Sequence, residues 1–531
     1  VFFPAVTGIA VGASMSGDLK DPGKNIPRGT LASIVFTAII YFAATYWIGV
    51  NVSQDDLVNK KMAMRDIAIW GDLIILGVWA ATLSSALGSV MAAPRTLQAL
   101  AYDRVMPRFV ASQLGSKTEP RVAVIVTTTI AVTIIWMGDL EAVATILTMF
   151  FLNSYGIINL SAGLEKLVGN PSYRPKFNIH WSLSLLGALG CYSAMLLITV
   201  PFTLLVIAIS FFVFVLLERR KMKTDFGDVR SGLWFSVARH SLLRLEDKEQ
   251  EIKNWRPNVI VFAGQTQKRE YLCDMGEWLA KGKGIVSFVQ LIAGNTSELA
   301  GSGLRDAGRR QMRAALKERG ISGFADCHIV SDFDGGALSV AQSYGVSGLE
   351  PNTVLMGYAK SEARHQAQFK LVRTLADLKK SVLILKYDPV KEFGNQSKID
   401  IWWSGRSRNG ELMLMLAHII SRHKSWDGAK IRVLQIVRNE DQAGHTEDNL
   451  KRTLENVRVR GEVKAVIPES GSSIAETIAA ASADADLTIV GMRMPENTDI
   501  PAMAAATDEL VRQLGSVLLV RSAEVEDLLG N

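Results

Sequence analysis

The sequence predicts an α-helical multi-pass membrane domain followed by an α/β domain with two parallel-sheet subdomains. Residues 1–217 contain 14 Lys or Arg and 11 Asp or Glu, whereas the remaining 314 residues contain 44 and 41. Long uncharged runs are confined to the first part, and in the second part short apolar runs alternate with charged segments. The boundary between membrane and soluble parts is therefore expected near Leu217.

Six membrane-spanning helices are expected in the first domain. A helix needs about 20 apolar residues to cross about 30 Å of hydrocarbon. Four uncharged runs come close to this length, and a fifth is long enough for two crossings that turn near Pro201. An interrupted apolar stretch, 1–17, precedes them. The five runs are 31–50, 73–93, 122–138, 142–164 and 177–217.

The basic residues of the loops predict the orientation of these helices. They are concentrated in alternate loops and directly after the last span, whereas the loop after the first full span holds only Lys60, Lys61 and Arg65. The positive-inside rule then places the soluble half in the cytoplasm of a plasma or cell membrane. The chain begins within apolar sequence at Val1, without an initiator methionine, so we expect a fragment whose earlier helices are missing.

The first apolar stretch is interrupted by Pro4, Gly8 and Gly12, which disfavour a continuous helix. One interpretation is a kinked packing helix with small residues at its contacts. The other is a discontinuous helix, whose freed carbonyls hold a cation and whose freed amides hold an anion such as chloride. In the second interpretation the cation oxygens come from Pro4 and Thr7, and the amides from Gly8, Ile9 and Ala10.

Three runs in this region resemble the sixth transmembrane helix and following loop of the cation-chloride cotransporters, in the amino acid-polyamine-organocation superfamily. They are residues 2–9, 12–22 and 26–30. The resemblance implies the second part of a LeuT-like fold. It also implies potassium ligands at Pro4 and Thr7 and a chloride site at Gly8, Ile9 and Ala10.

A second candidate site lies in the uncharged run 73–93. Ala81, Ser84 and Ser85 stand at i, i+3 and i+4 and so share one helical face. Intramembrane serines usually bond back to their own helix or allow close packing, but two hydroxyls and a carbonyl also suit a small hard cation. The segment resembles the eighth helix of the sodium-dependent cotransporters, where these three residues match the sodium ligands. Because potassium-chloride members lack the serine pair, the resemblance favours sodium coupling.

Tyr155 is the third candidate, within the uncharged run 142–164. A buried tyrosine normally finds a hydrogen-bond partner such as a backbone carbonyl. The run 150–159 resembles the tenth helix of the same family. That resemblance implies that the Tyr155 hydroxyl donates to the chloride held by Gly8, Ile9 and Ala10.

The soluble half shows the βαβ pattern of a parallel sheet twice. We expect a connecting helical segment at 218–256, a first α/β subdomain at 257–390 and a second at 391–531. The expected strands of the first are 259–263, 285–292, 327–330, 353–356 and 382–385. Those of the second are 399–403, 431–437, 463–467, 487–490 and 517–520. The segments 254–257 and 516–521 resemble the regulatory, dimerising carboxy-terminal domain of the same cotransporters.

Several other classes of protein find no support in the sequence. Neither a Gly-x-x-x-x-Gly-Lys-Ser/Thr loop nor a Gly-x-Gly-x-x-Gly motif follows an expected strand. Nucleotide binding by the soluble half therefore stays a minor alternative. The net charge of +6 is scattered and argues against a nucleic-acid partner. Three distant cysteines exclude a disulfide scaffold or zinc ribbon, and Cys327-His328 is expected to be structural. No nucleophile and base occur in a recognisable context, so an enzyme is not expected.

The sequence therefore predicts a secondary symporter that moves sodium together with potassium and chloride by alternating access, without a cofactor. Its expected partners are the transported ions, the lipid bilayer and a second copy of the chain in a homodimer. The alternatives are an amino-acid permease of the same superfamily and a potassium-chloride cotransporter.

Overall fold

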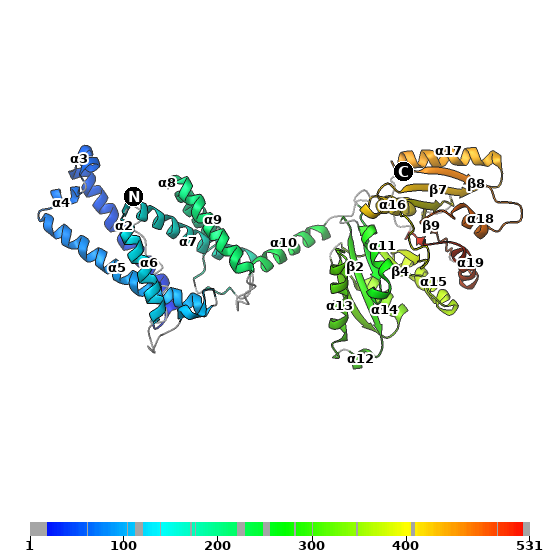
Figure 1. Ribbon diagram of the computed structural model, residues 1–531, viewed down its shortest axis with the longest axis horizontal. Coiled ribbons are helices and arrows are strands. Elements are labelled where there is room, and N and C mark those ends of the chain that lie inside the picture. The colour runs from blue at the N-terminus through cyan, green and yellow to red at the C-terminus, as the bar shows by residue number, and fades with distance from the viewer. Residues whose placement is uncertain are drawn as a thin grey trace. The chain divides into compact units, whose positions relative to one another are not determined.

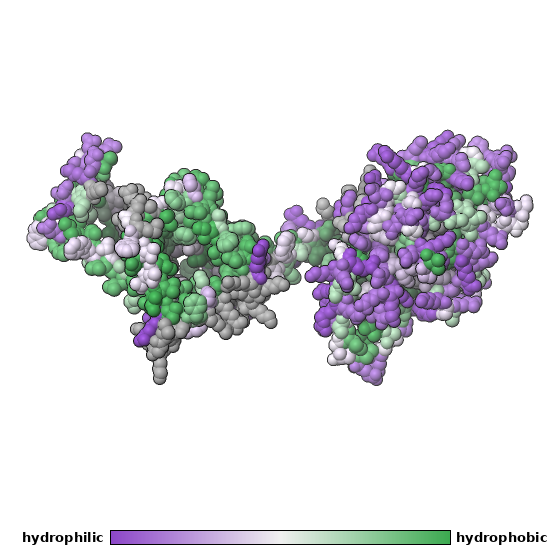
Figure 2. Space-filling model, in the orientation of Figure 1, coloured by the Kyte–Doolittle hydropathy of each residue, from purple (hydrophilic) through white to green (hydrophobic). Residues whose placement is uncertain are grey.

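The computed structural model describes residues 19–523, apart from 61, 104, 112–119, 139, 170–172, 176, 220–228, 248–254, 281–282, 300, 347–348, 405–408 and 496–497. The chain forms two compact units, Val1–Ala238 and Arg239–Asn531 (Figure 1). Hydrophobic side chains cover much of the first unit, whereas the second shows a mainly hydrophilic surface (Figure 2). The contrast follows the uneven distribution of charged residues along the sequence.

The first unit is helical, and among its described residues five helices are long and apolar enough to cross a membrane. They are α2 (Pro22–Asn51), α5 (Gly71–Tyr102), α7 (Leu140–Val168), α8 (Trp181–Ile198) and α9 (Val200–Arg219). The shorter apolar α6 (Arg121–Met137) corresponds to the sixth expected span. Between these lie α3 (Gln54–Asn59), α4 (Ala63–Ile67) and the 3-10 helix η3 (Arg108–Ala111). Each uncharged run therefore forms helix, as expected.

The longest run is divided into α8 and α9 at Thr199, whose backbone is extended with φ −157° and ψ 118°. Pro201 is the second residue of α9, where its missing N–H would have no partner within the helix. The Thr203 hydroxyl donates to the carbonyls of Met195 and Thr199, at 2.8 and 2.7 Å, and so satisfies carbonyls beside the break. The expected division near Pro201 is confirmed.

Helices α7, α8 and α9 pack through small and polar residues. A Cβ built on Gly156 would lie 3.0 Å from the Tyr192 ring, so the absence of a side chain there lets α7 approach α8 closely. Met149 and Met195 are fully buried between the helices. Asn153 on α7 donates to the Ser210 hydroxyl on α9 at 2.7 Å, which joins these two helices by a hydrogen bond.

The second unit contains a ten-stranded sheet in the order β3-β2-β1-β4-β5-β10-β9-β6-β7-β8. All ten expected strands are present. The first five are β1 (Asn258–Phe262), β2 (Ile285–Ala293), β3 (Phe324–Val330), β4 (Thr353–Gly357) and β5 (Ser381–Lys386). The second five are β6 (Lys398–Trp402), β7 (Lys430–Ile436), β8 (Glu462–Val466), β9 (Leu487–Gly491) and β10 (Val517–Arg521).

The two sets of strands are repeats of one topology. Within the first repeat (β1–β5) and within the second repeat (β6–β10), every pairing is parallel. The repeats meet at β5 and β10, which pair antiparallel from Lys386 opposite Val517 to Val382 opposite Arg521. The two expected parallel sets are therefore parts of one continuous sheet, because the last strand of each repeat leaves an edge that the other covers.

Helices cover both faces of this sheet, which gives three layers (Figure 1). One face packs on α11 (Glu270–Ala280), α13 (Leu304–Glu318), α16 (Asn409–Ser421) and α17 (Glu440–Asn456). The other packs on α14 (Phe333–Ser343), α15 (Glu362–Asp377), α18 (Ile474–Ala481) and α19 (Ile500–Gln513). The remaining helices are the short α12 (Thr296–Leu299), η5 (Thr266–Lys268) and η6 (Lys424–Trp426), and α10 (Val229–Glu246), which precedes the sheet. Core residues from both repeats occur in each hydrophobic cluster, so the repeats fold around shared cores.

Side chains cover the two outer edges of the sheet. Arg305 and Arg309 of α13 donate to the carbonyls of Cys327 and Ala325 on edge strand β3, at 3.1 and 3.3 Å. At the opposite edge, the Ala465 amide of β8 donates to Glu447 of α17 at 3.0 Å. These contacts occupy backbone groups that would otherwise be open to pairing with another strand.

Candidate functional site

The expected sodium ligands Ala81, Ser84 and Ser85 lie within α5, on an exposed stretch of the helix. Thr82, in the same turn, donates its hydroxyl to the carbonyl of Val78 at 2.8 Å, which is the common arrangement for hydroxyls within membrane helices. Ser89 donates to the carbonyl of Ser85 at 3.0 Å. In the part of the chain that the structure describes, the hydroxyls of Ser84 and Ser85 make no such bond.

Tyr155 is half-buried on α7, beside the face that packs on α8 and α9. Its ring centroid lies 6.1 Å from that of Phe151, with the planes tilted by 34°. Its backbone carbonyl accepts a hydrogen bond from Asn159 at 2.9 Å. The structure thus fixes the helical face on which Tyr155 lies, while its expected chloride partners fall elsewhere in the chain.

The described helices do not assemble the three expected ion sites. Helix α5 packs on α4, α6 and η3, whereas α7 packs on α8 and α9. The expected potassium and chloride residues Pro4, Thr7, Gly8, Ile9 and Ala10 lie outside the described residues. The ion-site assignments therefore stay predictions.

A cavity in the first repeat lies at the carboxyl ends of β1 and β4. The strand order reverses between these two strands, and the crevice at such a point is the usual ligand site of open parallel sheets. The cavity measures about 290 Å³ and is lined by Phe262, which ends β1, and by Met356 and Gly357, which end β4. A neighbouring cavity of about 290 Å³ shares Phe262, Arg269 and Phe333 with it.

Four basic side chains border these two cavities: Lys268, Arg269, Lys360 and Arg364. Arg364 forms a two-point ion pair with Asp334, with N–O distances of 2.9 and 3.0 Å, and lies 5.5 Å from the centre of the Phe333 ring. The other three form no ion pair with any described residue. Ser361, the N-cap residue of α15, also lines the first cavity, so the positive end of that helix dipole faces it.

Two buried side chains hold the loop after β4 against this cavity. Gln368 accepts from the Ala359 amide at 3.0 Å and donates to the Gly357 carbonyl at 2.8 Å. The His365 ring nitrogen Nε2 lies 2.6 Å from the Ala359 carbonyl, and Nδ1 lies 3.7 Å from Asp508 of α19. The Tyr358 hydroxyl also donates to Asp508, at 3.3 Å. Burial, followed by the neighbouring Asp508 carboxylate, raises the pKa of Tyr358, so the hydroxyl stays protonated.

At the equivalent ends of β6 and β9 in the second repeat, the described side chains pack closely against one another. Asn409 is 2% exposed, donates to the Met492 carbonyl at 2.8 Å and accepts from the Ser522 amide at 2.8 Å. A Cβ built on Gly410 would lie 2.5 Å from the Trp403 ring, which shows how closely that ring covers the start of α16.

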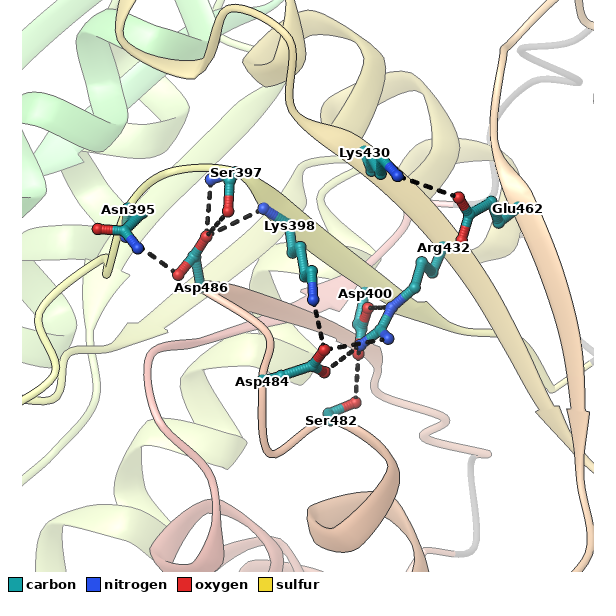
Figure 3. A network of polar contacts seen from close by, with 10 residues as sticks. All are labelled: Asn395, Ser397, Lys398, Asp400, Lys430, Arg432, Glu462, Ser482, Asp484 and Asp486. Atoms are coloured by element: carbon teal, nitrogen blue, oxygen red, sulfur yellow. Dashed lines mark hydrogen bonds and ion pairs between the residues drawn. The ribbon is translucent and has the colours of Figure 1, made fainter.

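The second repeat instead has an ion network at the opposite, amino-terminal ends of its strands (Figure 3). Asp400 is fully buried and accepts from Arg432 at 2.7 and 2.8 Å and from the Ser482 hydroxyl at 2.7 Å. Asp484 accepts from Arg432 and Lys398, both at 2.6 Å. Hydrogen bonds from Lys398 and Arg432 lower the pKa of Asp484 to about 2. Because every member has a partner, the network joins β6, β7 and the turn before β9.

Sequence reasoning missed the cavity of the first repeat. No glycine-rich phosphate loop marks this cavity. It is bordered by basic residues that follow two strands separated by about 90 positions in the sequence. The basic residues that follow two expected strands could have indicated this cavity. Lys268 and Arg269 follow β1, and Lys360 and Arg364 follow β4. Cys327 and His328 lie on β3, and no group of three His, Cys, Asp or Glu that could hold a metal occurs among the described residues.

Similar proteins match both halves of the chain. Residues 1–261 match the family model described as Amino acid permease, and residues 386–473 match the model described as Solute carrier family 12. A curated relative, Potassium/chloride cotransporter 3 from Caenorhabditis elegans, is 28% identical over 474 residues, which are 84% of this chain and 44% of the relative. The chain therefore spans less than half the length of that relative.

Two solved structures resemble the chain over about half its length. The cytoplasmic domain of a prokaryotic cation chloride cotransporter is 16% identical with a TM-score of 0.39, over 52% of this chain and 99% of that one. A universal stress protein from Archaeoglobus fulgidus is 13% identical with a TM-score of 0.36, over 52% of this chain and 100% of that one. The fold given above rests on the strand order and register of the chain itself.

Proposed function

We propose that the protein is a cation-chloride cotransporter, a secondary symporter that moves cations together with chloride by alternating access, because the chain matches the Amino acid permease and Solute carrier family 12 models and is similar to a potassium/chloride cotransporter. The family match supports this function, and the apolar helices of the first unit are consistent with it. Symport needs binding sites and conformational change, but no chemical step and no cofactor. The protein is therefore proposed to be a multi-pass membrane transporter, with no catalytic role.

Sodium is the first proposed cation, bound by the carbonyl of Ala81 and the hydroxyls of Ser84 and Ser85. The observation that supports it is the state of these hydroxyls: Thr82 and Ser89 bond to their own helix, whereas Ser84 and Ser85 do not. A small hard cation prefers such oxygen ligands. The competing proposal is potassium-chloride symport without sodium, and the printed name of the Caenorhabditis elegans relative favours that one.

The remaining ion sites are proposed on the resemblance of the first apolar stretch. Potassium would be held by oxygens of Pro4 and Thr7. Chloride would be held by the amides of Gly8, Ile9 and Ala10, with a hydrogen bond from the Tyr155 hydroxyl. A hydroxyl that donates to a partly desolvated anion makes a strong, charge-assisted bond.

Ion-omission uptake in proteoliposomes that contain the complete transporter tests these assignments. Chloride uptake that requires sodium, and that falls at least tenfold in the double variant Ser84→Ala, Ser85→Ala, supports the sodium site. Thr82→Val is the matched control, because it removes a hydroxyl from the same turn that is already bonded to its own helix. Full uptake by the double variant would reject the sodium site.

The same experiment separates the rival functions. Chloride uptake that requires potassium and ignores sodium indicates a potassium-chloride cotransporter. Sodium flux that is driven by an organic substrate and is independent of chloride indicates an amino-acid permease. Tyr155→Phe should raise the chloride concentration for half-maximal uptake severalfold while the half-maximal cation concentrations stay unchanged.

For the soluble half we propose a cytoplasmic location and a role in regulation and homodimer formation. The location rests on the basic residues of the alternate loops and on those that directly follow the last span, among them Arg219. The proposed domain limits are 1–217 for the membrane domain, 218–256 for the connecting segment, and 257–390 and 391–531 for the two α/β parts. Size-exclusion chromatography with light scattering on the complete transporter measures the oligomeric state.

A second candidate function is supported by the cavity of the first repeat: binding of a nucleotide that regulates transport. The aromatic rings of Phe262 and Phe333 offer an apolar wall, three basic side chains form no ion pair with a described residue, and the N-terminus of α15 faces the space. Phosphate and base could thus both be accommodated.

Titration calorimetry of the full chain with ATP, AMP and adenosine tests this function. We expect ATP to bind more tightly than adenosine, and Arg269→Glu with Lys360→Glu to weaken ATP binding at least tenfold. Lys451→Glu, an exposed charge change on α17, is the matched control. Equal affinities of the double variant and the control would reject the nucleotide site.

A further inference from the structure

Helix α10 (Val229–Glu246) connects the last membrane span to the α/β sheet and exposes large apolar side chains. Trp234 and Phe235 are each 71% exposed, and Leu245 is 43% exposed. Such side chains on a soluble helix normally face a partner of some kind. The chemistry of that partner follows from the pattern of the helix and from where the helix begins.

Part of the apolar surface of α10 forms an uncharged strip along the helix, while the exposed Leu233, Val237 and Leu243 lie outside this strip. At 3.6 residues per turn, six positions fall within an arc of about 100° that contains no charged side chain. Arg239 and Glu246 border this arc on one side and Ser241 on the other. His240 lies on the opposite face. We call the strip the aromatic face; it consists of Ser231, Trp234, Phe235, Ala238, Leu242 and Leu245.

The first turns of α10 contact a membrane-spanning helix. A Cβ built on Gly232 would lie 2.4 Å from Cγ1 of Val168, the last residue of α7, so the two helices meet there without a side chain on Gly232. Gly232 lies outside the aromatic face, so this contact leaves the face uncovered. Nine residues separate the end of α9 at Arg219 from Val229, a distance that cannot exceed about 35 Å.

The start of α10 is therefore close to the level at which two spanning helices end. At that depth tryptophan is the preferred large side chain, because its ring enters the headgroup region while its N–H stays hydrated. An arginine beside an apolar strip can extend its guanidinium toward lipid phosphates while its stem covers apolar surface. Helices that lie in the membrane surface combine these features.

We propose that the aromatic face of α10 lies in the headgroup region of the phospholipid bilayer, with its axis along the membrane surface. Trp234 and Phe235 then enter the boundary between headgroups and acyl chains, and Arg239 reaches the lipid phosphates. The leaflet is the cytoplasmic one, which rests on the orientation proposed above. The contact would hold the start of the soluble half at the membrane surface.

Nitroxide labels placed on opposite faces of α10 test this proposal in the complete transporter, reconstituted in phosphatidylcholine–phosphatidylserine vesicles. Ala238→Cys places a label at the centre of the aromatic face with little change in volume, and Trp234→Cys places a second one. His240→Cys is the matched control on the opposite face. The background carries Cys191→Ser, because Cys191 is half-buried and Cys273 and Cys327 are buried.

Collision with oxygen, which concentrates in lipid, is compared with collision with a water-soluble nickel chelate. We expect labels at 234 and 238 to favour oxygen at least threefold more than the label at 240, and brominated lipids to quench a fluorophore at 238. A label at 238 as open to the chelate as the one at 240 would overturn the proposal. So would shielding from both reagents, which would indicate a second copy or another protein surface. None of these readouts depends on which ions are moved, so this proposal can fail independently of the ion assignments.

Discussion

The two repeats of the soluble half have the same strand order but place their polar groups at opposite ends of the sheet. The first repeat leaves a cavity at the carboxyl ends of β1 and β4, bordered by Arg364, which pairs with Asp334, and by basic side chains that form no ion pair with a described residue. In the second repeat Asn409 and Trp403 pack at the corresponding ends of β6 and β9, and the charged network lies at the amino-terminal ends of β6 and β7.

This difference shows that the topology provides a possible site and that local side chains decide whether it stays open. In the first repeat, Gln368 and His365 hold the loop after β4 beside the cavity. In the second repeat every charge of the network is paired, so its role is to stabilise the repeat. The following changes test this division, from the largest expected effect to the smallest.

Removal of one partner from the buried Asp400–Arg432 ion pair should lower the free energy of unfolding most. Arg432→Met leaves the fully buried Asp400 carboxylate without its two-point partner, which costs about 3–5 kcal/mol because an uncompensated charge stays buried. Urea denaturation of the full chain, with hydrogen exchange at β6 and β7 as a local readout, measures the loss.

The double variant Arg432→Met, Asp400→Leu is the control for this change. It removes both charges and should recover much of the stability, since no lone charge remains. If the double variant were as unstable as Arg432→Met alone, packing rather than charge would explain the loss.

Gly410→Ala tests how tightly the second repeat closes its crevice. The added Cβ would lie 2.5 Å from the Trp403 ring, so the ring must move, at a cost of about 1–3 kcal/mol. Gly444→Ala on α17 is the matched control, because a Cβ there meets no atom within 4 Å. That control should stabilise the helix by about 0.5–1 kcal/mol. Thermal unfolding of both variants gives the comparison, and an unchanged Gly410→Ala protein would contradict the close packing.

Acidification, which protonates Asp484, should lower the free energy of unfolding least. The pKa of Asp484 is lowered from 3.8 to about 2 in the folded chain, so the folded state favours the charged form. The stabilisation is complete above pH 3.8 and is lost as the pH falls toward 2. Its size is at most about 1 kcal/mol, because the Asp484 side chain is 51% exposed and screened by solvent.

Asp484→Asn should remove this acid dependence while leaving that of other groups in place. Denaturation midpoints measured between pH 5 and pH 2.5 provide the comparison. Parallel curves for the variant and the original protein would show that Asp484 contributes nothing in this range.

The ten strands and the divided last membrane run were predictable, because both depend on local pattern. Short apolar runs between charged helices specify buried parallel strands. Pro201, within 41 uncharged residues, is most favourable in the first turn of a helix, so it indicated where α9 begins. Those signals lie within a few residues of the feature that they predict.

The cavity of the first repeat and the network of the second were not predictable in this way. Lys268 and Lys360 are far apart in the sequence and line neighbouring cavities only because β1 and β4 are neighbours in the sheet. Asp400, Arg432 and Asp484 come from three segments that no local motif connects.

The sequence by itself determined the division into membrane and soluble parts, the helices and strands within them, and the resemblance that leads to the proposed ion ligands. Only the tertiary structure decided that the two strand sets form one sheet, that β1 and β4 border a cavity, and that Asp400, Arg432 and Asp484 meet in one network. The physical reason is that periodicity and charge act over neighbouring residues. Edge pairing, closure of a crevice and hydrogen bonding depend on which groups come together in space.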